Sequence, residues 1–166
     1  LGVARDTESS LNQLIGQGLE KSDVLLLSGG VSMGRFDLVE DVLNHLDISC
    51  LIKKIALKPG KPMVFAVAKN GNLVFGLPGN PVSTMVTFEL FVRTAIARME
   101  GAENPVRPLL QAKLQRKLVS KGSRRAYLPG WVKIQEEDGA LLAFPVPTRG
   151  SGDIVAFSKS NALLIV

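Results

Sequence analysis

A glycine- and proline-rich stretch constrains the fold of this chain more than any other feature. The stretch is Gly-Leu-Pro-Gly-Asn-Pro-Val-Ser, residues 76–83, and it lies between the apolar residues 73–75 and helical spacing over 82–99. This order predicts a strand, a tight loop and a helix N-terminus, with Asn80 as N-cap and Pro81 in the first turn. Bare backbone N–H groups at such a helix start favour anions. The same residues would also make a rigid turn with ordinary capping.

Two further loops rich in glycine or proline lie upstream. Ser-Gly-Gly-Val-Ser-Met-Gly, residues 28–34, follows the apolar run 24–27, and Lys-Pro-Gly-Lys-Pro, residues 58–62, ends a predicted strand over 48–57. A continuous apolar run such as 24–27 is typical of a strand buried on both faces of a parallel sheet. All three loops therefore follow predicted strands.

Strand and helix patterns alternate up to residue 99. The predicted order is the end of a strand over 1–4, a helix over 11–19, the strand 24–27, a helix over 39–46, the strand 48–57, a hairpin of 63–68 and 73–75, and the helix 82–99. This alternation predicts a doubly wound α/β domain over residues 1–104. Ligands bind such sheets at the carboxyl ends of the strands, so we expect the three loops to meet on one rim. The sequence starts without Met, inside an apparent strand, and we expect it to be part of a longer protein.

The character of the sequence changes at residues 101–108. Short β patterns follow, without convincing helical spacing, over 109–114, 126–134, 141–146 and 162–166. They predict a small all-β, barrel-like domain over residues 105–166. The preceding helix, 82–99, has so narrow a polar face that we expect it to be largely buried, or else to line an oligomer interface.

Composition excludes several classes of function. No apolar run approaches 18 residues, so nothing indicates a membrane span, and 46% hydrophobic residues suffice for a packed core. The net charge of +5 suits an anionic ligand, but scattered basic residues and 5% aromatic residues do not indicate nucleic acid. A single cysteine, Cys50, excludes Cys-cluster metal sites, and the only histidine, His45, lies on a predicted helix at or near the surface, which disfavours Ser-His-Asp triads and His-based zinc sites. We expect His45 at the surface or its boundary and Cys50 as a buried structural thiol. Residues 29–34 have P-loop glycine spacing, but Arg35-Phe36 stand where that motif needs Lys-Ser/Thr.

The remaining polar residues form a set suited to oxyanions. Backbone and hydroxyl donors are offered in the first loop by Ser28, Gly29, Gly30 and Ser32.

Lysines flank the second loop. Lys58 and Lys61 lie on either side of a Pro-Gly turn, which brings two ammonium groups together and favours an anion between them, unless both are simply solvated. Lys54 precedes Lys58 by four residues, a spacing that places both on one side of a strand. Asp6 and Asp37 each follow a strand-end loop and could hold Mg²⁺ through carboxylate oxygens, cap a helix, or do both.

Taken together, loops 28–34 (with Asp37), 58–62 and 76–83 resemble the signature set of the molybdopterin molybdenumtransferases, the family of bacterial MoeA and the E domain of gephyrin. Three motifs in this order and spacing are highly specific. Residues 150–153 and 160–163 also resemble the family's C-terminal barrel. The resemblance implies the substrate-binding C-terminal part of an enzyme that inserts molybdenum from molybdate into adenylylated molybdopterin, with Mg²⁺-dependent hydrolysis of the adenylate.

The resemblance implies roles for the residues at matching positions. They are a catalytic set at the pterin phosphate, the metal and the pocket wall (Asp6, Asp37, Pro78 and Pro81, with Asp6 and Asp37 as metal ligands), an oxyanion set (Lys54, Lys58 and Lys61 with the donors Ser28, Gly29, Gly30, Ser32, Gly79 and Asn80), and secondary anion contacts (Ser151 and Arg124 or Arg125).

The family also implies partners and context. Its α/β domain has an earlier strand and helix, and two N-terminal domains complete its site across a dimer; the present sequence contains neither. A cytoplasmic homodimer supplied by an upstream molybdopterin adenylyltransferase is the implied setting, without nucleic acid or membrane. Two alternatives are open: a scaffold that binds peptides, as gephyrin does, and a related pterin-domain protein acting on another nucleotide, which the 76–83 loop and the β segment disfavour.

Overall fold

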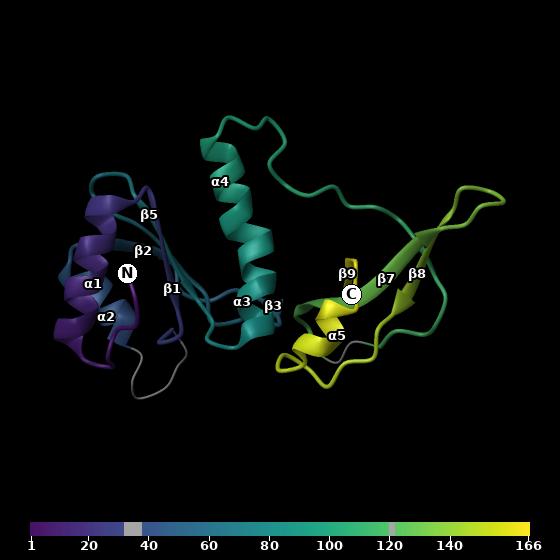
Figure 1. Ribbon diagram of the computed structural model, residues 1–166, viewed down its shortest axis with the longest axis horizontal. Coiled ribbons are helices and arrows are strands. Elements are labelled where there is room, and N and C mark those ends of the chain that lie inside the picture. The colour runs from purple at the N-terminus through teal and green to yellow at the C-terminus, as the bar shows by residue number, and fades with distance from the viewer. Residues whose placement is uncertain (32–37, 120–121) are drawn as a thin grey trace.

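The computed structural model describes residues 1–31, 38–119 and 122–166 (Figure 1). In chain order its elements are α1 (Glu8–Lys21), β1 (Val24–Ser28), α2 (Leu38–His45), β2 (Ser49–Ile52), β3 (Leu57–Lys58), β4 (Val64–Val67), β5 (Leu73–Leu77), α3 (Pro81–Thr87), the π-helical turn η1 (Phe88–Val92), α4 (Arg93–Met99), β6 (Lys113–Leu114), β7 (Arg125–Ile134), β8 (Leu141–Pro145), α5 (Ile154–Ser158) and β9 (Ala162–Ile165).

The N-terminal part is a three-layer α/β unit. Its sheet has the order β1-β5-β4-β2, with α1 and α2 on one face and the helix α3–η1–α4 on the other (Figure 1). One core cluster joins Ile15, Val42 and Leu43 of the first face to Leu25 and Val74 of the sheet. A separate cluster packs the other face against η1 and α4. Helices on both faces confirm the predicted α/β class.

The sheet is mixed rather than parallel throughout. β1 and β5 run parallel, but β4 is antiparallel to both β5 and β2. The β4–β5 hairpin turns at Asn70-Gly71, as predicted, and Gly71 has the positive φ of +91° that such turns require. β1 lies at one edge of the sheet, where Leu26 is 42% exposed, so its apolar run does not have both faces buried.

Two predicted strands differ in the structure. Residues 1–4 form no strand and are mostly exposed, so the expectation of a strand end there was wrong. The expected strand 48–57 divides into β2 and β3, because the register with β4 shifts between Cys50 and Ile52 and the chain then leaves the sheet. β3 instead pairs with β7 of the C-terminal part, with Leu57 opposite Arg125.

The predicted helix 82–99 is present as the continuous path α3–η1–α4. Its first half is largely buried, with Val82 and Val86 fully enclosed, whereas α4 contains no buried residue. The expectation of a largely buried helix therefore holds only for α3 and the end of η1, where Val92 is enclosed.

The C-terminal part is a β unit built around the ten-residue strand β7. β8 pairs with one end of β7, β9 with its first half, and β6 with β8. The strands described between 122 and 166, with β3 and β6, do not close into a barrel. The short helix α5 was not predicted, because five residues show too little of a helical repeat. Its N-cap is Asp153, whose carboxylate accepts the Ala156 N–H at 3.0 Å.

Candidate functional site

The three glycine- and proline-rich loops meet at one cavity of about 570 Å³ between the α/β and β units. The cavity is lined by Gly29, Gly30 and Val31 of the first loop, residues 58–62 of the second, Pro78, Gly79, Asn80 and Ser83 of the third, and Arg124, Tyr127, Leu128, Thr148, Gly150, Ser151 and Phe157 of the β unit. Two of these loops follow the parallel strands β1 and β5. The expectation that the loops share a rim is therefore correct, and the β unit forms the opposite wall.

Close backbone contact joins the first and third loops. The Gly29 N–H donates to the Leu77 carbonyl at 3.0 Å. A Cβ atom on Gly79 would lie 3.3 Å from the Gly29 Cα, and one on Gly76 only 2.6 Å from the Val31 Cγ1. These glycines let two strand-end loops lie against each other, so their backbone groups face the same space.

A glycine likewise fixes the lysine loop on α3. Gly60 is buried with φ +115°, and a Cβ there would lie 2.6 Å from the Thr87 Cγ2. The turn is tied back by the Ile55 N–H, which donates to the Lys61 carbonyl at 3.1 Å. Both Lys58, half-buried, and Lys61, exposed, line the cavity, as the paired-lysine interpretation requires.

The third loop is held by a threonine one turn into α3. The Thr84 hydroxyl is bonded to the Pro78 carbonyl and lies 3.0 Å from the Asn80 carbonyl. Asn80 is at the N-cap position, as predicted, but its side chain makes no capping bond and its Oδ1 is buried without a partner. Pro78 is buried against the cavity, whereas Pro81 is exposed and lines a separate shallow depression.

The β unit contributes a cation and a polar loop. The Arg124 Nη1 donates to the Leu57 carbonyl at 3.1 Å, which holds the arginine beside the lysine loop. Ser151 lies in the loop that ends at Asp153, whose carboxylate accepts the Arg149 and Ala156 N–H groups at 3.0 Å each. These two hydrogen bonds hold the pKa of Asp153 below its usual value, and the bond from the Arg149 N–H has the larger effect.

Several residues predicted for the site lie elsewhere. Lys54 is exposed and outside the cavity lining, because residues 53–56 are not in a strand and the parity argument that paired it with Lys58 does not apply. Ser28 lines the shallow depression with Pro81. Asp6 is exposed, and the N-cap of α1 is the following residue, Thr7. Ser32 and Asp37 lie outside the described residues.

The predicted metal site has no counterpart in the part of the chain that the structure describes. Residues 1–31, 38–119 and 122–166 contain no group of three or more His, Cys, Asp or Glu side chains that could hold a metal ion. The cavity lining within these ranges includes no carboxylate. The described donors alone therefore do not fit Mg²⁺, and the pairing of Asp6 with Asp37 stays a prediction.

Sequence reasoning did not select the aromatic wall of the cavity, Tyr127 and Phe157. Tyr127 lies on β7 in a predicted strand, where a buried tyrosine by itself gives no sign of a ligand. Phe157 lies on α5, which was not predicted. The choices of Arg124 and Ser151 were the predictions that pointed to this wall of the cavity.

The other singled-out residues are structural. His45 is exposed, as expected, and its Nδ1 lies 2.8 Å from a Glu8 carboxylate oxygen. Cys50 is only partly buried, although a buried thiol was expected, because it lies on β2 at an edge of the sheet. Burial, and then the charge of Glu40, raise the pKa of this thiol.

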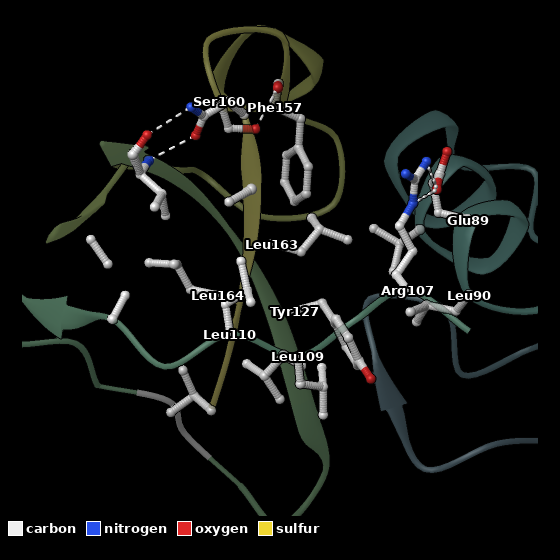
Figure 2. Close-up of a pocket in the computed structure, with 18 of the residues that line it drawn as sticks. Glu89, Leu90, Arg107, Leu109, Leu110, Tyr127, Phe157, Ser160, Leu163 and Leu164 are labelled. Carbon is white, nitrogen blue, oxygen red and sulfur yellow. Dashed lines mark hydrogen bonds and ion pairs between the residues drawn. The ribbon is translucent and has the colours of Figure 1, made fainter. Parts of the chain in front are cut away.

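A second cavity, of about 1180 Å³, lies between α3–η1 and the β unit. Figure 2 shows Leu90, Leu109, Leu110 and Leu163 around it, with Glu89 and Arg107 at one edge. Arg107 donates from Nε and Nη2 to one Glu89 oxygen at 3.2 and 3.1 Å. Leu109 and Leu110 remain 79% and 72% exposed, so the wall formed by the connecting segment is apolar and open to solvent.

Comparison with known proteins shows to which family the two parts of the chain are similar. Residues 1–98 match the family described as "Probable molybdopterin binding domain". The chain belongs to this molybdopterin-binding family. Residues 111–166 match the "MoeA C-terminal region (domain IV)", so both parts of the chain correspond to segments of MoeA-type proteins.

Named relatives agree with this assignment. The chain is 29% identical to a molybdopterin molybdenumtransferase of Nostoc sp. and 32% identical to one of Bacillus subtilis, and it covers 38% of each. These alignments include 99% and 100% of the chain. It is also 28% identical to gephyrin of Dictyostelium discoideum. That alignment includes 100% of this chain and 26% of the gephyrin chain. A crystal structure of a MoeA protein from Pyrococcus horikosii superimposes with a TM-score of 0.75 and 34% identity, over 99% of this chain and 38% of that one. The chain thus spans about two fifths of the length of the transferases it matches.

Proposed function

We propose that this chain is the substrate-binding C-terminal part of a molybdopterin molybdenumtransferase. In this proposal the protein takes part in molybdenum cofactor biosynthesis by inserting molybdenum from molybdate into adenylylated molybdopterin, with hydrolysis of the adenylate. The observation that carries the proposal is the convergence of all three family loops on one cavity with Lys58, Lys61 and Arg124 in its lining. A tetrahedral dianion requires such cations together with N–H donors.

Different residues of the cavity would bind different parts of the ligand. Lys58, Lys61 and Arg124 would neutralise molybdate or the ligand's phosphates, because no carboxylate lines the described cavity to compete for them. The first and third loops offer backbone N–H donors at Gly30 and Gly79, whereas the Gly29 N–H is already bonded to the Leu77 carbonyl. Tyr127, Phe157 and Pro78 supply apolar surface that would exclude water from a flat pterin ring.

Mg²⁺ is part of the proposed reaction. When bound, it would offset the negative charge of the phosphoanhydride. Its proposed ligands are Asp6 and Asp37, on the basis of their positions after strand-end loops and of the resemblance to the family.

The proposed setting is a cytoplasmic homodimer that receives its substrate from an upstream molybdopterin adenylyltransferase. No helix in the ranges that the structure describes is long and apolar enough to cross a membrane. We also propose domain limits of 1–104 and 105–166, which the separate family matches over 1–98 and 111–166 support.

The test is release of adenylate from adenylylated molybdopterin in the presence of molybdate and Mg²⁺, by the chain joined to the N-terminal part found in its relatives. We expect turnover by the parent and a loss of turnover, with ligand binding weakened, in Asp37→Asn. Undiminished turnover in Asp37→Asn would contradict its assigned role. Absence of both binding and turnover in the parent would contradict the proposed function.

A second candidate function is a peptide-binding scaffold. The larger, apolar cavity in Figure 2 favours it, since Leu109 and Leu110 expose a surface that a partner segment could cover. In this case a peptide pull-down would be sensitive to Leu110→Asp and insensitive to Lys58→Ala, and the chain would bind no pterin.

A further inference from the structure

The net positive charge of the chain is confined to its C-terminal part. Residues 1–104 contain ten Lys and Arg against eleven Asp and Glu, a formal charge of −1. Residues 105–166 contain ten Lys and Arg against four Asp and Glu, a formal charge of +6. The charge of the β unit therefore exceeds the net charge of the whole chain, +5. Such a one-sided distribution of charge acts on ligands over a longer range than any single motif.

Two cations of the β unit, Arg124 and Arg125, lie at the start of β7 next to the binding cavity, whereas Lys113 lies across β8 from Lys133, near the other end of β7. Residues 113–125 include six Lys and Arg and no acidic residue. Arg124 lines the cavity, and the exposed Arg125 follows it at the start of β7, directly opposite Leu57 of the lysine-loop strand. None of Lys113, Arg116, Lys117, Arg124 and Arg125 forms an ion pair with any residue that the structure describes.

The acidic residues of the β unit do little to offset the positive charge of Arg124 and Arg125. Three of the four, Glu136, Glu137 and Asp138, lie in the turn beyond the far end of β7. At about 3.3 Å per residue, that turn is about 30 Å from Ala126, several Debye lengths at physiological salt. The fourth, Asp153, accepts the backbone N–H of Arg149 and offsets the charge of that arginine.

We propose that the β unit steers polyanionic ligands into the cavity, with Arg125 as a residue that raises the association rate without lining the site. This inference rests on the proposed function, because it takes the cavity to be the ligand site. A cleft walled by one sign of charge raises the encounter rate of oppositely charged ligands and does so less as salt is added. A phosphoanhydride-bearing ligand gains most, since it carries several negative charges.

The test compares two substitutions on β7 that each remove one positive charge. Arg125→Gln removes a charge beside the cavity, and Lys133→Gln removes the same charge eight residues along β7, about 26 Å away. Both residues are exposed, and neither lines the cavity. The association and dissociation rates of adenylylated molybdopterin are followed by stopped-flow pterin fluorescence at ionic strengths from low to above physiological, with thermal unfolding as a check on folding.

Steering predicts that Arg125→Gln lowers the association rate about threefold at low ionic strength. The loss should disappear at high salt, and the dissociation rate should not change. Lys133→Gln should leave both rates close to those of the parent. A parent association rate independent of salt, or equal effects of the two substitutions, would overturn the steering while leaving the proposed function intact. Failure of the parent to bind at all would instead overturn the proposed function and the steering with it.

Discussion

Gly60→Ala should damage both the stability and the binding cavity of this protein. At φ +115° an L-residue is strained by about 1–3 kcal/mol. In addition, the new methyl carbon would lie 2.6 Å from the Thr87 Cγ2 and 3.0 Å from the Leu57 Cδ2. Thr87 cannot turn away cheaply, because it is fully buried and its hydroxyl donates to the Ser83 carbonyl at 2.8 Å. Relieving this overlap costs about a further 1–3 kcal/mol.

Gly71→Ala is the matched control. Gly71 also has a positive φ, +91°, but a Cβ there would meet nothing within 4 Å. It should therefore show the strain without the overlap. The difference of about 1–3 kcal/mol corresponds to a melting temperature lower by roughly 2–12 °C for Gly60→Ala than for Gly71→Ala.

The assay combines thermal unfolding with a titration of inorganic phosphate. Gly60→Ala should also weaken phosphate binding, because the turn that carries Lys58 and Lys61 must move away from α3, whereas Gly71→Ala should not. Equal melting temperatures for the two variants, with unchanged phosphate affinity in both, would refute the argument that packing of Gly60 on α3 positions the lysines.

Two further predictions concern the other loops. Thr84→Val should cost about 1 kcal/mol and weaken ligand binding, because the hydroxyl that joins the Pro78 and Asn80 carbonyls is lost; Thr94→Val, whose hydroxyl bonds only the Leu90 carbonyl at 2.9 Å, should leave binding unchanged in the same titration. The folded-state pKa of Asp153 is depressed, so its contribution to stability is present above the ordinary Asp pKa and is lost as pH falls through the lowered value. Asp153→Asn should remove that acid dependence, and amide hydrogen exchange at Ala156 as a function of pH would show it; the same acid-induced loosening in the variant would contradict the assignment.

The sequence predicted the parts of the fold that are encoded locally. The hairpin at Asn70-Gly71, the helices over 11–19, 39–46 and 82–99, and the strand-loop-helix order at residues 73–83 all follow from spacing and turn chemistry within a short window. The meeting of the first and third loops followed from a general rule about strand ends, whereas loop 58–62 reaches them from β3, which pairs in the other sheet.

The expectations that failed depend on contacts between distant residues. Nothing within residues 48–57 signals that the chain leaves one sheet at Ile52 and joins β7 of another at Leu57. Lys54 was placed in the site only because an unbroken strand was assumed. The aromatic wall of Tyr127 and Phe157 likewise depends on how the β unit lies against the α/β unit, which no local pattern records.

The central claim is that the cavity between the three loops is an anion site built around the lysine loop. Calorimetric titration of molybdate into the parent, Lys58→Ala and Lys69→Ala tests it most directly. Lys69 is a suitable control, because it lies in the β4–β5 turn and pairs with Asp47 at 2.9 Å, away from the cavity. We expect Lys58→Ala to weaken molybdate binding about tenfold and Lys69→Ala to leave it unchanged. Equal affinities in the two variants would contradict the claim.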